Sequence, residues 1–301
     1  MNNDLNNVKG ILAIIFASFL WGTTGTVASY APQINSLAIG AFSMGVGGIF
    51  LVFNAREKLL KNSQKLLSSP KLLLLGSLSI VVYPLAFYTS MRLSGVAIGT
   101  VISIASAPLF AALLERLISK KAISAQWLIS FIIGAIGIAL LALGRKIDSN
   151  ASDIYQQSIG IILGCIAGLS YASYSWATRQ LIEKGVDSQT AMSTLFGGAA
   201  LLLLPSLWWT VGNLPFSSTN LSVALYLAIV PTFIGYLLFA FGLKFVDASK
   251  ATLITLIEPL IATLLAVFII GEKFKLIGWI GVFFVSLCLL IQTWKVKKTP
   301  Q

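Results

Sequence analysis

Apolar residues along this chain fill long continuous stretches in which charged residues are almost absent. A helix that crosses a bilayer needs about 20 such residues, and the stretches have this length or about twice it. Two of them, 10–55 and 188–243, are long enough for two helices each, with turn signals at residues 31–35 and 211–217. The others are 72–91, 93–114, 122–144, 154–178, 251–270 and 276–294. The pattern predicts an all-α integral membrane protein with ten transmembrane helices.

The first stretch has one competing interpretation, a cleaved secretory signal peptide. The small residues at 27–31 offer a superficial cleavage site. Only Lys9 supplies positive charge in front of the stretch, however, and the apolar run is longer than the hydrophobic region of a typical signal peptide. We therefore expect a retained transmembrane helix.

A segment in the first half of the chain resembles one in the second half. Residues 95–114 read GVAIGTVISIASAPLFAALL and residues 246–265 read VDASKATLITLIEPLIATLL, so that Pro108 and Pro259 correspond at an offset of 151. The match predicts two repeats of five helices each, at residues 1–150 and 151–301. Because five is odd, the second repeat must enter the membrane from the opposite side. Inverted repeats of this kind are typical of transporters, whose site lies between the repeats.

Composition agrees with this pattern and excludes several other classes of protein. Hydrophobic residues make up 57% of the chain and charged residues 10%, whereas soluble domains carry roughly 25% charged residues. The net charge of +11 is spread over short clusters between apolar stretches, as in membrane loops, so we expect no nucleic-acid partner. The chain has no histidine, and Cys165 and Cys288 lie inside apolar stretches without metal-ligand spacing. We expect no metal and no cofactor.

Lysine and arginine residues gather on one side of the predicted bundle. If the N-terminus is cytoplasmic, 16 of the 21 basic residues fall in cytoplasmic segments. The remaining five are Arg92, Arg145, Lys146, Lys273 and Lys275. The positive-inside rule then predicts a multi-pass protein of the bacterial inner membrane with both termini in the cytoplasm. Anionic lipid is the expected partner of the C-terminal basic residues Lys295, Lys297 and Lys298.

Among the ten carboxylates, only Glu258 lies in the middle of a predicted helix. A charge at the bilayer centre costs at least about 2.5–3.5 kcal/mol, which makes this residue a functional candidate. Pro259 follows it and removes a backbone donor, which loosens the helix at this point. Glu258 is predicted to bind a substrate amine or to carry a coupling proton, and the alternative is a carboxyl group that packs helices. Its repeat counterpart is Ala107, so the predicted cavity carries a carboxylate from the second repeat and no matching charge from the first.

Aromatic and hydroxyl side chains recur in the middle of several predicted helices. They predict an aromatic-lined pocket that binds a flat or cationic solute by stacking and cation–π contacts. Ordinary packing and interfacial belts are the alternative, which we favour for Trp208, Trp209 and Trp294 at helix ends. The predicted substrate-binding residues are Trp21, Thr24, Tyr83, Tyr88, Ser106, Tyr171, Tyr174, Tyr236 and Glu258.

Four prolines within apolar stretches are predicted hinges of a moving bundle. Pro84 and Pro231 fall in corresponding helices of the two repeats, and Pro108 and Pro259 correspond directly. Interrupted helices in both halves are typical of the moving or binding elements of a transporter, although a simple packing kink is the alternative. Glycines such as Gly137 are predicted to mark close helix contacts.

Taken together, these motifs resemble the drug/metabolite transporter superfamily and, within it, the ten-helix EamA type. The resemblance covers nearly the whole chain. It rests on Phe19 to Thr23, on Tyr88 and Thr89 through Pro108, on Tyr171, Tyr174 and Arg179, on Glu258 and Pro259, and on Gly271, Glu272 and Lys273. One departure is the end of stretch 93–114, where Ser119, Lys120 and Lys121 stand in place of the family's frequent Gly-Glu pair.

The resemblance implies transport of amino acids or other small metabolites, by proton or solute exchange in some members. It also implies a central cavity among the first helix of 10–55, the stretches 72–91, 93–114 and 154–178, the second helix of 188–243, and 251–270. We therefore predict a secondary transporter, an exporter or exchanger, of small zwitterionic or cationic metabolites such as amino acids. Protons are the candidate coupling ion, and the repeat is compatible with a monomer. A channel-like permease, a membrane enzyme and a structural or receptor protein are the alternatives.

Overall fold

The computed structural model describes residues 2–144, 154–210, 217–271 and 273–293, in which helices account for almost every residue and no β-strand occurs. Ten spans are long and apolar enough to cross a membrane, which confirms the predicted fold class. The segments are α1 (Asn2–Ala28), α2 (Ser36–Leu67), α3 (Pro70–Ser94), α4 (Val96–Leu117), α5 (Ala125–Gly144), α6 (Ile154–Glu183), α7 (Ser188–Thr210), α8 (Ser218–Leu227), η1 (Ala228–Ile234), α9 (Gly235–Leu243), α10 (Ala248–Ile254), α11 (Ile257–Leu265), η2 (Ala266–Ile270) and α12 (Leu276–Thr293).

Two of the spans are interrupted helices of the second repeat. The eighth span consists of α8, the π-helical segment η1 and α9, and the ninth consists of α10, α11 and the π-helical segment η2. Several sequence predictions fall outside the described residues. They are the turn at 211–216, the boundary between residues 150 and 151, and the loop residues Arg145, Lys146, Glu272, Lys295, Lys297 and Lys298.

Local sequence signals explain where the first helices begin and end. The predicted turn at 31–35 separates α1 from α2, and the Asn35 side chain caps α2 by accepting a hydrogen bond from the Leu37 backbone N–H at 2.9 Å. Gly95 alone connects α3 to α4 and has a φ of 87°, a conformation that glycine adopts without steric cost. The predicted helix after 31–35 ends at Ala55, but α2 continues to Leu67. Its 32 residues exceed a bilayer core, so its charged last turns project beyond the apolar layer.

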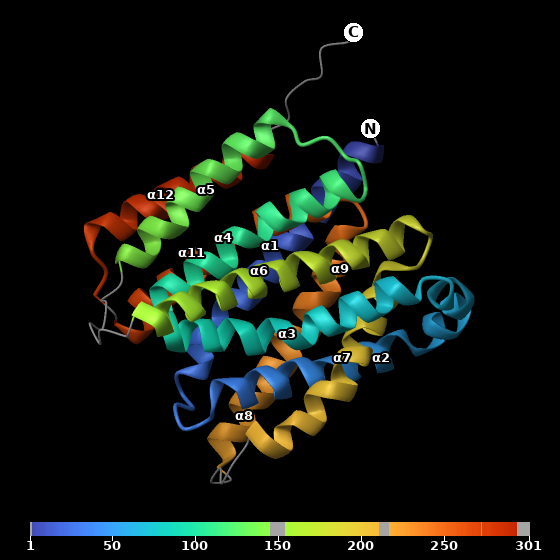
Figure 1. Cartoon of the computed structure of the whole chain (residues 1–301), viewed down its shortest axis with the longest axis horizontal. Helices are drawn as coiled ribbons and strands as arrows, with labels where there is room; N and C mark the ends of the chain where they lie inside the picture. The colour runs from blue at the N-terminus through green and yellow to red at the C-terminus, as the bar shows by residue number, and fades with distance from the viewer. Residues whose placement is uncertain (1, 145–153, 211–216, 272, 294–301) are drawn as a thin grey trace.

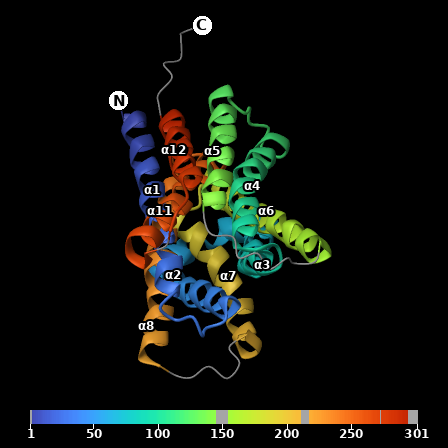
Figure 2. The same ribbon diagram turned by 90° about the vertical axis from the view of Figure 1, so that its left-hand side faces the viewer.

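The two repeats pack as an inverted pair. Equivalent helices of the two halves contact each other, α5 with α12 and α2 with α7, as a two-fold axis between the repeats requires. Figure 2 shows the first pair at the top of the view and the second pair in its lower half, with a central layer that contains α1, α4, α6 and α11 at heights between them. In this central layer α6 packs on α3 and α4, and α1 packs in the corresponding way on α9 and α11.

Small residues allow these helices to approach closely, as the sequence predicted for Gly137. A Cβ atom on Gly281 of α12 would lie 2.7 Å from the Gly137 carbonyl oxygen and 2.5 Å from the Leu141 nitrogen of α5. Close backbone contact supplies van der Waals energy where lipid removes most of the hydrophobic driving force between helices.

The two ends of the bundle differ in charge. We call the end that holds the connections 68–69, 118–124, 184–187 and 244–247 the basic end, and the end that holds 29–35, Gly95 and 271–275 the opposite end. In Figure 1 the basic end lies to the right, where α1 also begins and α12 ends. The even number of spans accounts for the first helix beginning and the last helix ending at the same end of the bundle.

Candidate functional site

A cavity of about 110 Å³ lies between the two repeats. Its walls come from α1, α2, α3, α6, α8, η1, α9 and α11. The structure brings eight of the nine predicted substrate-binding residues to this cavity: Trp21, Thr24, Tyr83, Tyr88, Tyr171, Tyr174, Tyr236 and Glu258. Clefts between helices of a bundle are common sites for small molecules, so the cavity is the candidate functional site.

The cavity rests on a floor of packed aromatic rings. The centroids of Trp21 and Tyr236 are 4.9 Å apart, and those of Tyr171 and Tyr174 are 5.3 Å apart. Below them Phe196 of α7 packs on Tyr236 at 4.3 Å. Tilted and edge-on contacts at these distances are favourable between rings, so the floor is a continuous, well-packed layer.

Hydrogen bonds fix the orientation of these rings. The Trp21 indole N–H donates to the Pro231 carbonyl oxygen at 2.8 Å, and the Tyr171 hydroxyl donates to the Thr255 hydroxyl at 2.9 Å. The hydroxyl groups of Tyr174 and Tyr236 bond to each other at 3.0 Å. Each bond joins a different pair of helices, so the floor also ties α1 and α6 to the eighth and ninth spans.

Glu258 stands beside a break in the ninth span. Helix α10 ends at Ile254 and α11 begins at Ile257, and Pro259 has no N–H that could continue the ladder. The Glu258 side chain reaches the cavity, and among the described residues its carboxylate has neither a hydrogen-bond donor nor an ion-pair partner. No lysine or arginine lines this cavity within the described part of the chain. Its repeat counterpart Ala107 is fully buried in packing.

The four predicted hinge prolines occupy different settings. Pro84 and Pro108 lie inside the continuous helices α3 and α4, and Pro231 lies inside η1. Pro259 lies two residues after the start of α11. Pro84 and Pro231 also line the cavity, so a change of angle at either would change its shape.

Ser106 is the one predicted site residue that the structure does not bring to the cavity. Its hydroxyl oxygen faces Gly168 at the contact between α4 and α6, and it donates to the Ser103 carbonyl oxygen at 3.4 Å. No residue of α4 is among the described lining residues, although the resemblance placed stretch 93–114 beside the cavity.

The structure also adds lining residues that sequence reasoning missed. Helix α2 contributes Gly40, Ser43 and Met44, and Phe87 and Thr232 complete the wall. Ser43 carries a hydroxyl group in the part of α2 that is rich in small residues, and this polar group was a usable signal for a cavity position. The glycines around Ser43 are equally typical of close helix contacts, and the sequence does not distinguish a helix that lines a cavity from one that packs on a neighbour.

The cavity continues toward the opposite end of the bundle. A second hollow of about 240 Å³ is lined there by residues that include Asn35, Thr89, Arg92 and Val96. Tyr88 lines both hollows, so the deeper cavity and this outer vestibule adjoin at its side chain.

The sequence matches a known family in both halves. The model of the EamA-like transporter family matches residues 8–143 and again residues 158–293. The chain belongs to the EamA-like transporter family. The double match agrees with the two inverted five-helix repeats, and it confirms the resemblance drawn from the motifs.

Relatives of this EamA-like transporter extend over nearly its whole length. It is 34% identical to the uncharacterized transporter YwfM of Bacillus subtilis (strain 168), over 93% of this chain and 92% of that protein. It is 26% identical to Protein PecM of Dickeya dadantii (strain 3937), over 92% and 89% of the two chains. A solved crystal structure at 17% identity superposes with a TM-score of 0.78, covering 94% of this chain and 96% of that one, which shows the shared fold. The EamA-like chain is thus a multi-pass membrane protein of a transporter family.

Proposed function

We propose that this EamA-like transporter is a secondary transporter that moves small cationic or zwitterionic metabolites, such as amines and amino acids, by alternating access. The observation that carries the proposal is the Glu258 carboxylate, which has no partner among the described residues and faces a cavity without a described basic side chain. An ammonium group is its natural counterpart, because opposite charges attract strongly where water is scarce.

The aromatic floor supports the same class of solute. The faces of tryptophan and tyrosine rings attract cations, and Trp21, Tyr171 and Tyr236 surround the cavity. Strongly anionic solutes find no complementary charge among the described lining residues and are expected to be excluded. Protons are the candidate coupling ion, with Glu258 as the carrier.

A carrier fits the described interior better than the channel-like alternative. The aromatic floor blocks the path from the cavity to the basic end, so solute cannot cross without a rearrangement of helices. We further propose that the basic end faces the cytoplasm of a bacterial cell and the protein lies in its inner membrane, in accordance with the positive-inside rule.

The test is counterflow in proteoliposomes with wild type and Glu258→Gln side by side. A labelled primary amine, a labelled amino acid and a labelled dicarboxylate are supplied in turn against an unlabelled excess of the same solute. We expect saturable uptake of the amine or the amino acid, no uptake of the dicarboxylate, and a loss of at least about tenfold in Glu258→Gln, since removing a charge partner costs 1.4 kcal/mol or more.

The matched control is Glu57→Gln, which removes a carboxylate from the projecting part of α2, where the residue is exposed. Uptake that never saturates would support the channel instead. Unchanged counterflow in Glu258→Gln would assign the carboxyl to helix packing, and uptake of the dicarboxylate would refute the proposed solute class.

A further inference from the structure

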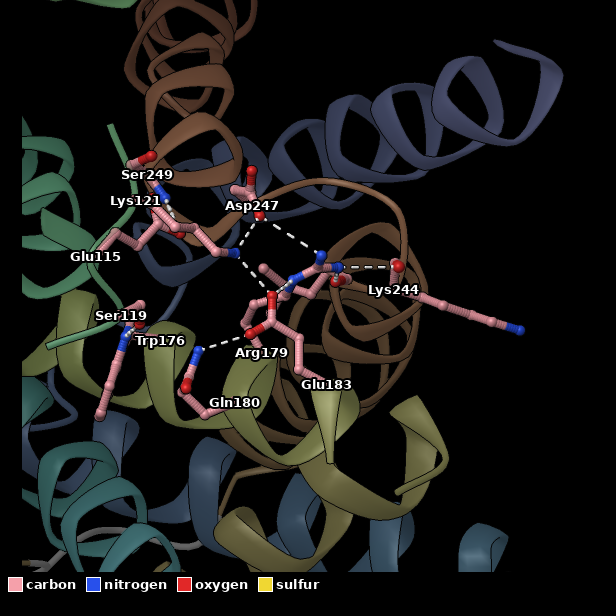
Figure 3. Close-up of polar contacts among 11 residues, drawn as sticks. Glu115, Ser119, Lys121, Trp176, Arg179, Gln180, Glu183, Lys244, Asp247 and Ser249 are labelled. Carbon is pink, nitrogen blue, oxygen red and sulfur yellow. Dashed lines mark hydrogen bonds and ion pairs between the residues drawn. The ribbon is translucent and has the colours of Figure 1, made fainter. Parts of the chain in front are cut away.

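Four charged side chains meet at the basic end of the bundle (Figure 3). We call Lys121, Arg179, Glu183 and Asp247 the ionic junction. The Lys121 ammonium lies 2.7 Å from a carboxylate oxygen of Glu183 and 2.7 Å from one of Asp247. The Arg179 guanidinium lies 2.9 Å from Glu183 and 3.5 Å from Asp247. Each cation thus contacts both anions, so the junction is a closed ring rather than a set of separate pairs.

The ionic junction joins the two repeats at three points of the chain. Lys121 belongs to the α4–α5 connection of the first repeat, whereas Arg179 and Glu183 lie in the last turns of α6 and Asp247 precedes α10 in the second. Arg179 also donates to the carbonyl oxygens of Leu243 and Lys244 at the end of α9, at 2.6 and 2.9 Å. The junction therefore draws the ends of α4, α6, α9 and α10 together over the basic end of the cavity.

Two further hydrogen bonds beside the ionic junction also join the two repeats. The Trp176 indole N–H of α6 donates to the Ser119 hydroxyl at 2.9 Å, and the Ser249 backbone N–H of α10 donates to a Glu115 carboxylate oxygen of α4 at 3.3 Å. Figure 3 shows these contacts flanking the junction.

The backbone beside Lys121 is held in a strained conformation. Lys120 has a φ of 55°, in the left-handed region that residues other than glycine rarely adopt, and the next N–H, of Lys121, donates to the Glu115 carbonyl oxygen at 3.0 Å. Burial lowers the pKa of Lys121, but the hydrogen bonds and charges of Asp247 and Glu183 outweigh burial and leave that pKa above its ordinary value. The local structure thus aims a charged ammonium at the two carboxylates.

Among the described residues, the opposite end has no charged side chain at the positions that correspond to this junction. At the repeat offset of 151 residues, Arg179, Glu183 and Asp247 correspond to Ala28, Pro32 and Val96, all uncharged. The counterpart of Lys121 is Glu272, which lies outside the described residues. Val96 lines the outer vestibule, so the position that closes the basic end in one repeat borders an open hollow in the other. In an inverted repeat the two ends of the pathway are built from equivalent elements, and within the described residues only the basic end is held by ion pairs.

We propose that the ionic junction is a gate that closes the basic end and holds the empty protein with its cavity open to the opposite end. The proposal deepens the proposed function, since the gate regulates access to the same cavity. To release solute at the basic end, the ring of ion pairs must open. The four charged side chains then move apart as the ends of α4, α6 and α10 separate.

The test measures access to the cavity from the basic end. The full chain, with Cys165→Ser and Cys288→Ala, carries a reporter cysteine at the cavity position Ser43 and is embedded in membrane vesicles whose basic end faces the medium. A membrane-impermeant maleimide is added, and the labelling rate of the reporter is measured in Lys121→Gln, in the matched control Lys120→Gln and in Lys121→Arg.

We expect Lys121→Gln to raise the rate about 2- to 30-fold, the range that two partly exposed ion pairs allow, because it increases the fraction of open gates. Lys120→Gln removes a charge that makes no described ion pair, and Lys121→Arg keeps the charge, so both are expected to label at the parent rate. Glu183→Gln is expected to raise the labelling rate as Lys121→Gln does. It keeps the test decisive if the Lys121→Gln protein does not reach the membrane.

Equal rates in Lys121→Gln, Glu183→Gln and Lys120→Gln would overturn the gate. The readout needs no transported solute, so it separates this proposal from the proposed function. A protein that shows the labelling differences but moves neither amines nor amino acids would retain the gate and refute the solute class.

Discussion

Trp21 is the residue that links the walls of the cavity most directly. Its ring packs on Tyr236 at a centroid distance of 4.9 Å and on Phe239 at 5.2 Å, and its N–H donates to the carbonyl oxygen of Pro231. One side chain from the first repeat therefore orients two segments of the second. Phenylalanine at this position would keep most of the ring and lose the donor.

We expect Trp21→Phe to lower the free energy of unfolding by about 0.5–1.5 kcal/mol, the net contribution of one hydrogen bond. It should also raise the KM for a cationic solute, because tryptophan has the strongest cation–π face. Thermal unfolding in detergent and counterflow measure the two effects. The control is Trp208→Phe, whose side chain is 88% exposed at the end of α7, and a comparable loss there would contradict the assignment.

The π-helical segment η1 has a specific chemical cause at the scale of the element. Pro231 has no N–H, so the carbonyl oxygen of Leu227, four residues earlier, lacks the donor that an α-helix would supply. The i→i+5 spacing of a π-helix gives that oxygen to the backbone N–H of Thr232, one residue further on, and the Thr232 hydroxyl donates to the same oxygen at 2.8 Å. Proline and threonine thus act as a pair, in which the second residue satisfies the acceptor that the first one frees.

Thr232→Val is expected to destabilise the protein by about 0.5–1.5 kcal/mol, since the Leu227 oxygen loses one of its two hydrogen-bond donors. The double variant Pro231→Ala, Thr232→Val should recover most of this loss, because alanine restores the backbone N–H. Thermal unfolding of the single and double variants gives the coupling free energy between the two positions. Additive effects would show that the hydroxyl does not substitute for the backbone donor.

The contact between α5 and α12 yields a second prediction at this scale. A methyl group on Gly281 would lie within 2.7 Å of backbone atoms of α5, whereas one on Gly25 of α1 would meet no atom within 4 Å. Gly281→Ala is therefore expected to cost about 1–3 kcal/mol through overpacking. Gly25→Ala is the matched control and should be neutral or slightly stabilising, since alanine favours helix. Equal melting temperatures of the Gly281→Ala and Gly25→Ala variants would mean that α5 and α12 can move apart without a cost in stability.

For the whole molecule, the placement of charge predicts the orientation in the membrane. Protease sites added to each end of the chain should both be protected in right-side-out vesicles and both be cut in inverted ones, because ten spans bring the ends together and the basic end is expected in the cytoplasm. A site inserted between Gln33 and Ile34 is the control and should behave in the opposite way.

Cleavage of both termini in right-side-out vesicles would reverse the proposed orientation. Cleavage of only one terminus would contradict the even number of spans. Either result leaves the geometry of the cavity and the ionic junction unchanged and alters only which compartment each of them faces.

The sequence alone determined the number of spans, the inverted repeat and the isolated carboxylate. These are local properties, because a stretch of about 20 apolar residues must cross the bilayer whatever its neighbours do. A charge such as Glu258 inside one of these stretches stands out for the same reason. Mid-helix tyrosines on α3, α6 and α9 were also visible, since polar atoms at that depth need partners or a cavity.

Only the tertiary structure decided which face of each helix meets the cavity. Helices that are apolar on all sides carry little information about their rotation, because lipid and protein interior are almost equally good surroundings for their side chains. For this reason Ser106 on α4 turned out to face Gly168, whereas Ser43 on α2 faces the cavity. The ionic junction likewise unites residues from three distant parts of the chain, and only the packing of the two repeats brings their charges within bonding distance.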